Sequence, residues 1–296
     1  MNRARASVVL LVSALLIAVL AAPSLGAGLY RVDPDVIYGH KMGMALTYDV
    51  IEPANPNGAG VLFMVSGGWF SRWSDPSAAI QRSTAFASLL ERGFTLFLVR
   101  HGSSPLFKVP DAVTDVRQAL RHIRANAADW KVDAERLGVF GGSAGGHLSL
   151  MLGVATEAAY EGSPAMGDER PAAVVAYFPP VDLQPLVGPN ERFPALDFDR
   201  ELGDEVSPLL FVSKDDVPTL LIHGDADELV PLDHSKRIKA AFDEQGVTSE
   251  LIVIPGAGHG FRGDHEKQAA DALVRWFEQY LVPATGVTTT GSGSEQ

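Results

Sequence analysis

The chain has 296 residues, of which 46% are hydrophobic and 20% are charged, and its formal net charge at pH 7 is −12. This acidity gives no electrostatic attraction for nucleic acid, so we expect no nucleic-acid partner. The chain has no cysteine, which excludes a thiol nucleophile, a cysteine zinc site and a lipidated N-terminal cysteine.

The first 27 residues have the layout of a secretory signal peptide. Arg3 and Arg5 precede an apolar run at 7–22, and small residues follow up to Ala27. A membrane-spanning helix needs about 20 apolar residues, and this run is shorter. We predict cleavage between 21 and 27, a secreted or periplasmic protein and no stable membrane anchor. An uncleaved anchor is the alternative.

Strand-like and helix-like segments alternate along the rest of the chain. The predicted strands lie at 59–66, 93–100, 136–142, 172–178, 217–224 and 249–256, and a further antiparallel edge strand at 44–53. The predicted helices lie at 75–91, 110–129, 144–155, 232–244 and 264–281. Strands that are apolar throughout suit a sheet covered on both faces. The pattern predicts an α/β fold with a doubly wound, mostly parallel sheet and helices on both faces.

Two segments depart from this alternation. Residues 179–208 contain six prolines, and we interpret them as a small cap insertion over the C-terminal edge of the sheet. Residues 283–296 have no core-forming pattern and are predicted to be a flexible tail. One catalytic domain would then span 28–282.

The stretch 141–145 reads Gly-Gly-Ser-Ala-Gly and fits the G-x-S-x-G nucleophile elbow. A predicted strand precedes it and a predicted helix follows, which is the context that the motif requires. Ser143 is therefore the candidate nucleophile. A glycine-rich turn with a serine helix cap is the alternative.

A serine hydroxyl needs a histidine base, and the histidine needs an acid to orient it. The predicted strand 217–224 is followed by Asp225 and Asp227, and the predicted strand 249–256 by His259. The order Ser, Asp, His is the one expected for a nucleophile elbow. Either aspartate could supply the acid, and a loop histidine without a partner is the alternative for His259.

An ester hydrolase also needs N–H donors for the oxyanion of its tetrahedral intermediate. One candidate is Ala144, directly after the nucleophile, and the others are Gly67 and Gly68, in the loop after the strand 59–66. A simple turn is the alternative for this loop. Trp69 and Phe70 are candidate walls of the substrate pocket, although Phe70 could equally pack in the core.

Together these residues resemble the α/β-hydrolase superfamily, and in particular its bacterial serine esterase and prolyl-oligopeptidase-related branch. The resemblance rests on GGSAGGHLSLML, HGDADELVP and GAGHGF. It implies Asp227, rather than Asp225, as the acid. Many such esterases carry His-Gly-Gly-Gly at the oxyanion loop, where this chain has Val65-Ser66-Gly67-Gly68, so that Gly67, Gly68 or Trp69 could be the donor.

We therefore expect a serine carboxylic ester hydrolase that acts through an acyl-enzyme and needs no metal or organic cofactor. The resemblance to acetyl- and feruloyl-esterases implies a short-acyl or carbohydrate-linked ester as substrate. A serine peptidase acting on short peptides is the first alternative. A binding protein that retains the fold without the chemistry is the second.

Overall fold

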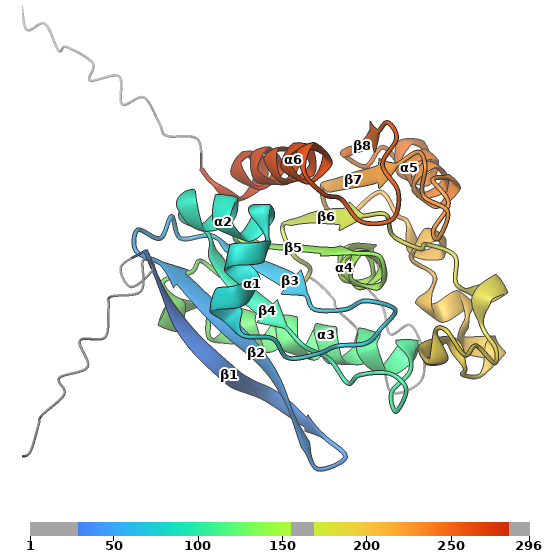
Figure 1. Ribbon diagram of the computed structural model, residues 1–296, viewed down its shortest axis with the longest axis horizontal. Helices are drawn as coiled ribbons and strands as arrows, with labels where there is room; N and C mark the ends of the chain where they lie inside the picture. Colours follow the sequence, from blue (N-terminus) through green and yellow to red (C-terminus); the bar gives the residue numbers. More distant parts are fainter. Residues whose placement is uncertain (1–28, 155–168, 284–296) are drawn as a thin grey trace, which may run out of the picture.

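The computed structural model describes residues 29–154 and 169–283 (Figure 1). Its centre is an eight-stranded sheet in the order β1-β2-β4-β3-β5-β6-β7-β8. The strands are β1 (Tyr30–Lys41), β2 (Met44–Pro53), β3 (Gly60–Met64), β4 (Thr95–Val99), β5 (Leu137–Gly142), β6 (Ala173–Tyr177), β7 (Thr219–Gly224) and β8 (Ser249–Ile254).

The sheet is mostly parallel, as predicted. β2 pairs antiparallel with β1 and β4, and every other neighbouring pair is parallel. The predicted edge strand at 44–53 is β2, but the actual edge is β1, which the sequence analysis missed. β1 carries Pro34 between two aspartates and has only one buried residue, Tyr38, so it lacks the apolar signal of a buried strand.

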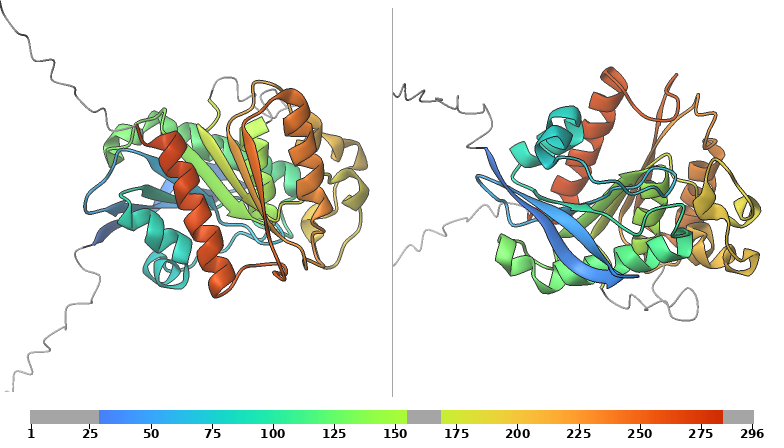
Figure 2. Two further views of the ribbon diagram at one scale, coloured as in Figure 1. Left: turned by 90° about the horizontal axis from the view of Figure 1, so that it is seen from above. Right: turned by 60° about the horizontal axis from the view of Figure 1, so that its bottom comes forward.

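Helices cover both faces of the sheet (Figure 2). They are α1 (Pro76–Arg82), α2 (Thr84–Glu91), α3 (Val109–Ala125), α4 (Ala144–Val154), α5 (Asp233–Gln245) and α6 (Asp264–Leu281). One buried cluster joins the sheet to α3, α4 and α5. A second joins the opposite face to α1, α2 and α6. This two-sided burial explains why the central strands are apolar throughout.

The predicted helix at 75–91 is divided in two at Ser83. The backbone of Ser83 is extended, with φ of −119°, and its side chain accepts a hydrogen bond from the amide of Phe86. Serine is a strong N-cap residue, so Ser83 ends α1 and begins α2. The two helices nevertheless occupy the predicted range.

The proline-rich insertion forms five short 3-10 turns between Gln184 and Phe211. Two contacts place it beside the loops that follow β3 and β4. A Cβ at Gly68, beyond the end of β3, would lie 2.9 Å from the ring of Phe193. The ammonium of Lys108, just before α3, donates to the carbonyl oxygen of Pro194 at 2.8 Å.

The predicted signal peptide lies outside the described residues, as does the predicted tail beyond residue 283. Among the helices that the structure describes, none combines the length and the hydropathy that a membrane crossing would require.

Candidate active site

Three loops at the carboxyl ends of β5, β7 and β8 carry Ser143, Asp227 and His259. β7 and β8 pair in parallel with Gly224 opposite Ile254, so the loops that follow them leave the sheet side by side. The carboxyl edge of a parallel sheet is where α/β proteins bind their ligands. The alternation of strands and helices therefore delivers all three residues to one edge.

Ser143 lies at a sharp turn between β5 and α4. Its φ is 55°, in the left-handed region that few residues other than glycine occupy. Its amide donates to the carbonyl oxygen of Tyr177, at the end of the neighbouring β6, at 2.9 Å. Such strain persists only where the surroundings impose it, and it is typical of functional positions. The predicted elbow geometry is present.

Two glycines allow this turn to be tight. A Cβ at Gly141 would lie 2.5 Å from the carbonyl group of Gly145, and a Cβ at Gly145 would lie 2.7 Å from the carbonyl oxygen of Met64. Both separations are too short for a side chain. The first turn of α4 therefore packs directly on the ends of β5 and β3, which places Ser143 at the sheet edge.

Asp227 holds His259 by a direct hydrogen bond. Its Oδ2 lies 2.8 Å from Nδ1 of His259, and its Oδ1 accepts from the amides of Leu229 and Val230, each at 2.9 Å. The carboxyl group is fully buried, whereas the His259 side chain is 22% exposed. Because a carboxylate only accepts, Nδ1 carries the proton and Nε2 is left free to act as a base.

Asp225 has a different partner. Its Oδ1 accepts from the amide of Gly256, in the neighbouring loop, at 2.6 Å. This hydrogen bond ties the two loops together at their base. The structure thus brings Asp227, and not Asp225, to His259.

His223 lies beneath the pair and supports it. Its Nε2 is 2.8 Å from the carbonyl oxygen of Val230 and 3.4 Å from Oδ2 of Asp227, while Nδ1 is 2.8 Å from Oγ of Ser235. Burial lowers the pKa of His223 below its usual value. A neutral ring in this place does not neutralise the charge of Asp227.

Phe178, directly after β6, connects the elbow with His259. A Cβ at Gly142 would lie 3.1 Å from its ring, and the ring centroid is 4.6 Å from that of His259. Its φ of 37° is another left-handed value. Gly142, which precedes Ser143, and His259 therefore both lie against the ring of Phe178. No local motif marks Phe178, which is why the sequence analysis missed it.

Residues 67–70, here called the oxyanion turn, form a tight reversal after β3. The amide of Gly67 donates to the carbonyl oxygen of Phe70 and the amide of Phe70 to that of Gly67, both at 3.0 Å. Gly68 and Trp69 have φ of 58° and 57°, the pattern of a two-residue hairpin with both central residues left-handed.

This pairing corrects one predicted oxyanion donor. The amide of Gly67 is already engaged with Phe70, whereas those of Gly68 and Trp69 donate to no acceptor in the described part of the chain. Ala144 is the first residue of α4, and its N–H has no partner within the helix because it lies in the first turn. The candidate donors are therefore Gly68, Trp69 and Ala144.

The two predicted pocket walls differ in exposure. Trp69 is only 4% exposed, and its indole N–H donates to Nδ1 of His147, in α4, at 3.4 Å. Its ring therefore belongs to the core beneath the turn, where it offers little surface to a substrate. Phe70 is half-buried beside Arg72, whose guanidinium lies 5.4 Å from the ring centroid, and it stays a candidate wall.

Phe178 also lines a pocket of about 150 Å³. Its lining is largely aromatic, with one carboxylate at Glu266, and includes Phe63, Phe140, Tyr177 and Phe261. The pocket is therefore one aromatic ring away from His259.

Across residues 29–154 and 169–283, no three histidine, aspartate or glutamate side chains form a group that could hold a metal ion. The carboxylates of Asp225 and Asp227 are bonded to the amide of Gly256 and to His259, respectively.

A doubly wound sheet with a serine on a left-handed strand–helix turn, followed in the chain by a hydrogen-bonded Asp–His pair, defines an α/β-hydrolase. Comparison with known protein families leads to the same class. The BD-FAE family model matches residues 48–242, about two thirds of the sequence, and the chain belongs to this family.

Several related proteins are named as esterases. Esterase LipC of Mycobacterium tuberculosis is 32% identical over 71% of this chain and 54% of its own length. The acetylxylan esterase of Xylanibacter ruminicola is 26% identical over 71% of this chain and 42% of its own. The chain thus spans about half the length of these relatives. A truncated carbohydrate esterase from gut microbiota is 29% identical, with a TM-score of 0.69, over 84% of this chain and 97% of that one.

Proposed function

We propose that this protein is a serine carboxylic ester hydrolase that acts through Ser143, His259 and Asp227. The observation that carries the proposal is the 2.8 Å hydrogen bond between Asp227 and Nδ1 of His259, at the same sheet edge as a strained Ser143. Family membership and the names of the relatives support the same reaction class.

In the first half of the reaction, Nε2 of His259 removes the hydroxyl proton of Ser143 as Oγ attacks the ester carbonyl carbon. Asp227 keeps the ring in the tautomer that leaves Nε2 unprotonated and stabilises the imidazolium that forms. The carbonyl oxygen becomes an oxyanion, which accepts from Ala144 and from the oxyanion turn through Gly68 or Trp69.

The intermediate then expels the alkoxide, which takes the proton from His259 and leaves as the alcohol. In the second half, His259 removes a proton from water, whose oxygen attacks the acyl-enzyme. The bond to Ser143 breaks, Oγ regains its proton, and the acid is released. Every proton moves through His259, and the only reactant consumed besides the ester is water.

We propose a short-acyl or carbohydrate-linked ester as the substrate. Two relatives are named as an acetylxylan esterase and a carbohydrate esterase, which supports this choice by analogy. The aromatic pocket beside Phe178 offers space for a small apolar group of the ester.

The test is turnover of a panel of p-nitrophenyl esters of increasing acyl length, alongside aminoacyl p-nitroanilides. We expect ester turnover by the wild type and none by Ser143→Ala, together with labelling of Ser143 by a fluorophosphonate. Turnover of anilides without esters would identify a peptidase instead. A wild type that neither turns over esters nor reacts with the probe would identify a binding protein.

We also propose that residues 1–27 direct export and are removed, and that the mature protein is secreted or periplasmic. The basic start, the apolar run and the small residues that follow support this. N-terminal sequencing of the exported protein should find a first residue between 22 and 28. An intact Met1 would contradict the proposal.

A further inference from the structure

Ser66 and His101 form a hydrogen-bonded pair that the proposed reaction does not use. β3 and β4 pair in parallel with Met64 opposite Val99, so residues two positions further along emerge next to each other. These residues are Ser66 and His101, and Oγ of Ser66 lies 2.9 Å from Nε2 of His101. Ser66 directly precedes the oxyanion turn.

The partners of His101 determine its tautomer. Its Nδ1 lies 2.8 Å from the carbonyl oxygen of Gly102, which can only accept, so Nδ1 carries the proton. Nε2 must then accept the hydroxyl hydrogen of Ser66. The ring is 4% exposed, and burial lowers the pKa of His101 to about 4. So weak a base is poorly suited to activate Ser66, and the pair is better understood as a tie between two loops.

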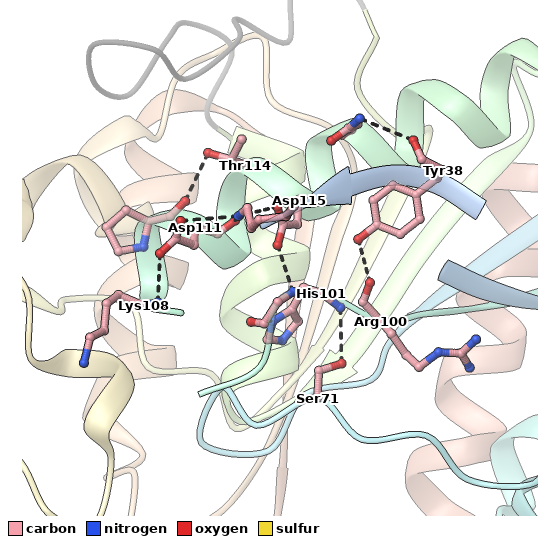
Figure 3. Close-up of polar contacts among 12 residues, drawn as sticks. Tyr38, Ser71, Arg100, His101, Lys108, Asp111, Thr114 and Asp115 are labelled. Atoms are coloured by element: carbon pink, nitrogen blue, oxygen red, sulfur yellow. Dashed lines mark hydrogen bonds and ion pairs between the residues drawn. The ribbon is translucent and has the colours of Figure 1, made fainter. Parts of the chain in front are cut away.

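Further hydrogen bonds hold the rest of the oxyanion turn to the same segment, and Figure 3 shows the one between Ser71 and His101. The amide of His101 donates to Oγ of Ser71, directly after the turn, at 3.2 Å. The amide of Ser71 donates to Oγ of Ser103, and that of Ser104 to the carbonyl oxygen of Trp69, both at 3.0 Å. Both ends and the interior of the turn are thus bonded to residues 101–104.

Residues 101–104 are in turn anchored to a helix. The amide of Gly102 donates to Oδ2 of Asp115, in α3, at 2.8 Å (Figure 3), and the other carboxylate oxygen pairs with the ammonium of Lys41 at 2.6 Å. The Asp115 side chain is 1% exposed. The tie at His101 therefore connects the oxyanion turn to a rigid, buried support.

The same turn also adjoins the helix that carries the other donor. A Cβ at Gly145 would lie 3.4 Å from the carbonyl oxygen of Ser66, so Ser66 packs against the first turn of α4. A displacement of Ser66 would change the separation between the turn and the amide of Ala144. An oxyanion accepts well only when its donors are already in place.

We propose that His101 is a positioning residue which, through Ser66, holds the oxyanion turn at the distance from Ala144 that the tetrahedral intermediate requires. This inference rests on the proposed esterase function. It assigns to His101 and Ser66 the anchoring of a loop that lacks the histidine found there in many esterases.

The test compares four single variants and one double variant for kcat and KM on the best p-nitrophenyl ester. Ser66→Ala removes the hydroxyl alone. His101→Asn can replace Nδ1 toward Gly102 but cannot reach Ser66, whereas His101→Gln can place an acceptor near the position of Nε2. Tyr38→Phe is the matched control, because the Tyr38 hydroxyl donates to the carbonyl oxygen of Arg100 at 2.6 Å and does not contact the turn.

We expect Ser66→Ala and His101→Asn to lower kcat about 10- to 100-fold at nearly unchanged KM, since a displaced donor weakens transition-state binding. A trifluoromethyl ketone, which forms a tetrahedral adduct, should lose affinity by a similar factor. His101→Gln should recover most of kcat. The double variant Ser66→Ala/His101→Asn should be no worse than either single one, because both remove the same hydrogen bond.

The inference is overturned if kcat of Ser66→Ala and His101→Asn stays within two-fold of the wild type. It is also overturned if Tyr38→Phe lowers kcat by as much. A third contrary result would be a normally folded His101→Gln whose kcat is no higher than that of His101→Asn. Activity of the wild type and inactivity of Ser143→Ala are measured in the same assay. If the wild type is active and Ser143→Ala is inactive, but loss of the Ser66–His101 hydrogen bond does not change kcat, the esterase function stands and this inference alone fails.

Discussion

The carboxylate of Asp227 accepts a hydrogen bond from His259 at 2.8 Å, whereas the carboxylate of Asp225, two residues earlier, accepts from the amide of Gly256 at 2.6 Å. The two aspartates follow the same strand and differ little in sequence context. Their partners, however, give them separate tasks: one orients a base, and the other joins two loops.

Replacement of each aspartate by asparagine should separate these tasks. We expect Asp227→Asn to lower kcat by roughly 10⁴-fold, as loss of the orienting carboxylate does in serine proteases, because the amide favours the wrong tautomer of His259. Asp225→Asn retains an acceptor for Gly256 and should stay within a few-fold of the wild type. Equal losses in the two variants, measured on one p-nitrophenyl ester, would refute the assignment.

The unfolding free energy should fall as the solution is acidified, partly because of His147. Burial lowers the pKa of His147 from 6.5 to about 4 because its ring is fully enclosed; the hydrogen bond that the ring donates to the carbonyl oxygen of Val206 at 2.7 Å only partly offsets this shift. Between these pH values the unfolded chain binds a proton that the folded chain does not, so stability is lost as pH falls from about 6.5 towards 4. The loss is on the order of 3 kcal/mol.

The matched comparison is urea unfolding of the wild type and His147→Gln across this pH range. The variant lacks the titrating ring, so its stability should depend less on pH. Asp216, whose pKa burial raises to about 6, acts in the opposite direction but contributes equally to both proteins. Parallel curves for the two proteins would rule out the predicted role of His147.

Packing at the elbow should make Gly145 intolerant of a side chain. A Cβ there would meet the carbonyl oxygen of Met64 at 2.7 Å, whereas a Cβ at Gly67 would meet no atom within 4 Å. We expect Gly145→Ala to lower the unfolding free energy by about 2 kcal/mol or more, through strain of the backbone around Ser143. Gly67→Ala should change it by less than about 1 kcal/mol. Thermal and urea unfolding measure both, and a reversed order would contradict the described packing.

Removal of the Phe178 ring should let the side chain of His259 move away from its catalytic position. The ring lies against both Gly142 and His259, so Phe178→Ala leaves His259 free to tilt, and we expect kcat to fall about 10-fold or more. Phe86→Ala is the control, because Phe86 is a buried aromatic that packs on Phe63 and Phe140. It should cost stability without a comparable loss of kcat at a temperature where both variants are folded. Equal kcat losses would mean that general loosening, and not contact with His259, limits the rate.

Much of the fold followed from local pattern. The central strands are apolar runs and the helices have their own periodicity, so their order was predictable, and α6 was predicted to the residue. β1 was missed because a strand held by a single neighbour needs little apolar surface. The break at Ser83 was missed because the capping serine stands inside a segment that is otherwise compatible with a helix.

The sequence by itself determined the order of Ser143, Asp227 and His259 and their positions after successive strands, because chain order and strand ends are local properties. Only the tertiary structure supplied the contacts that distinguish Asp227, which the family resemblance had implied, from Asp225. It also replaced Gly67 by Gly68 and Trp69 among the candidate donors, and it brought Phe178 against His259 and Ser66 against His101. These outcomes depend on strand register and on hydrogen bonds between residues far apart in the chain. A side chain's partner across such a distance is set by how the loops close against one another, which no local pattern of residues specifies.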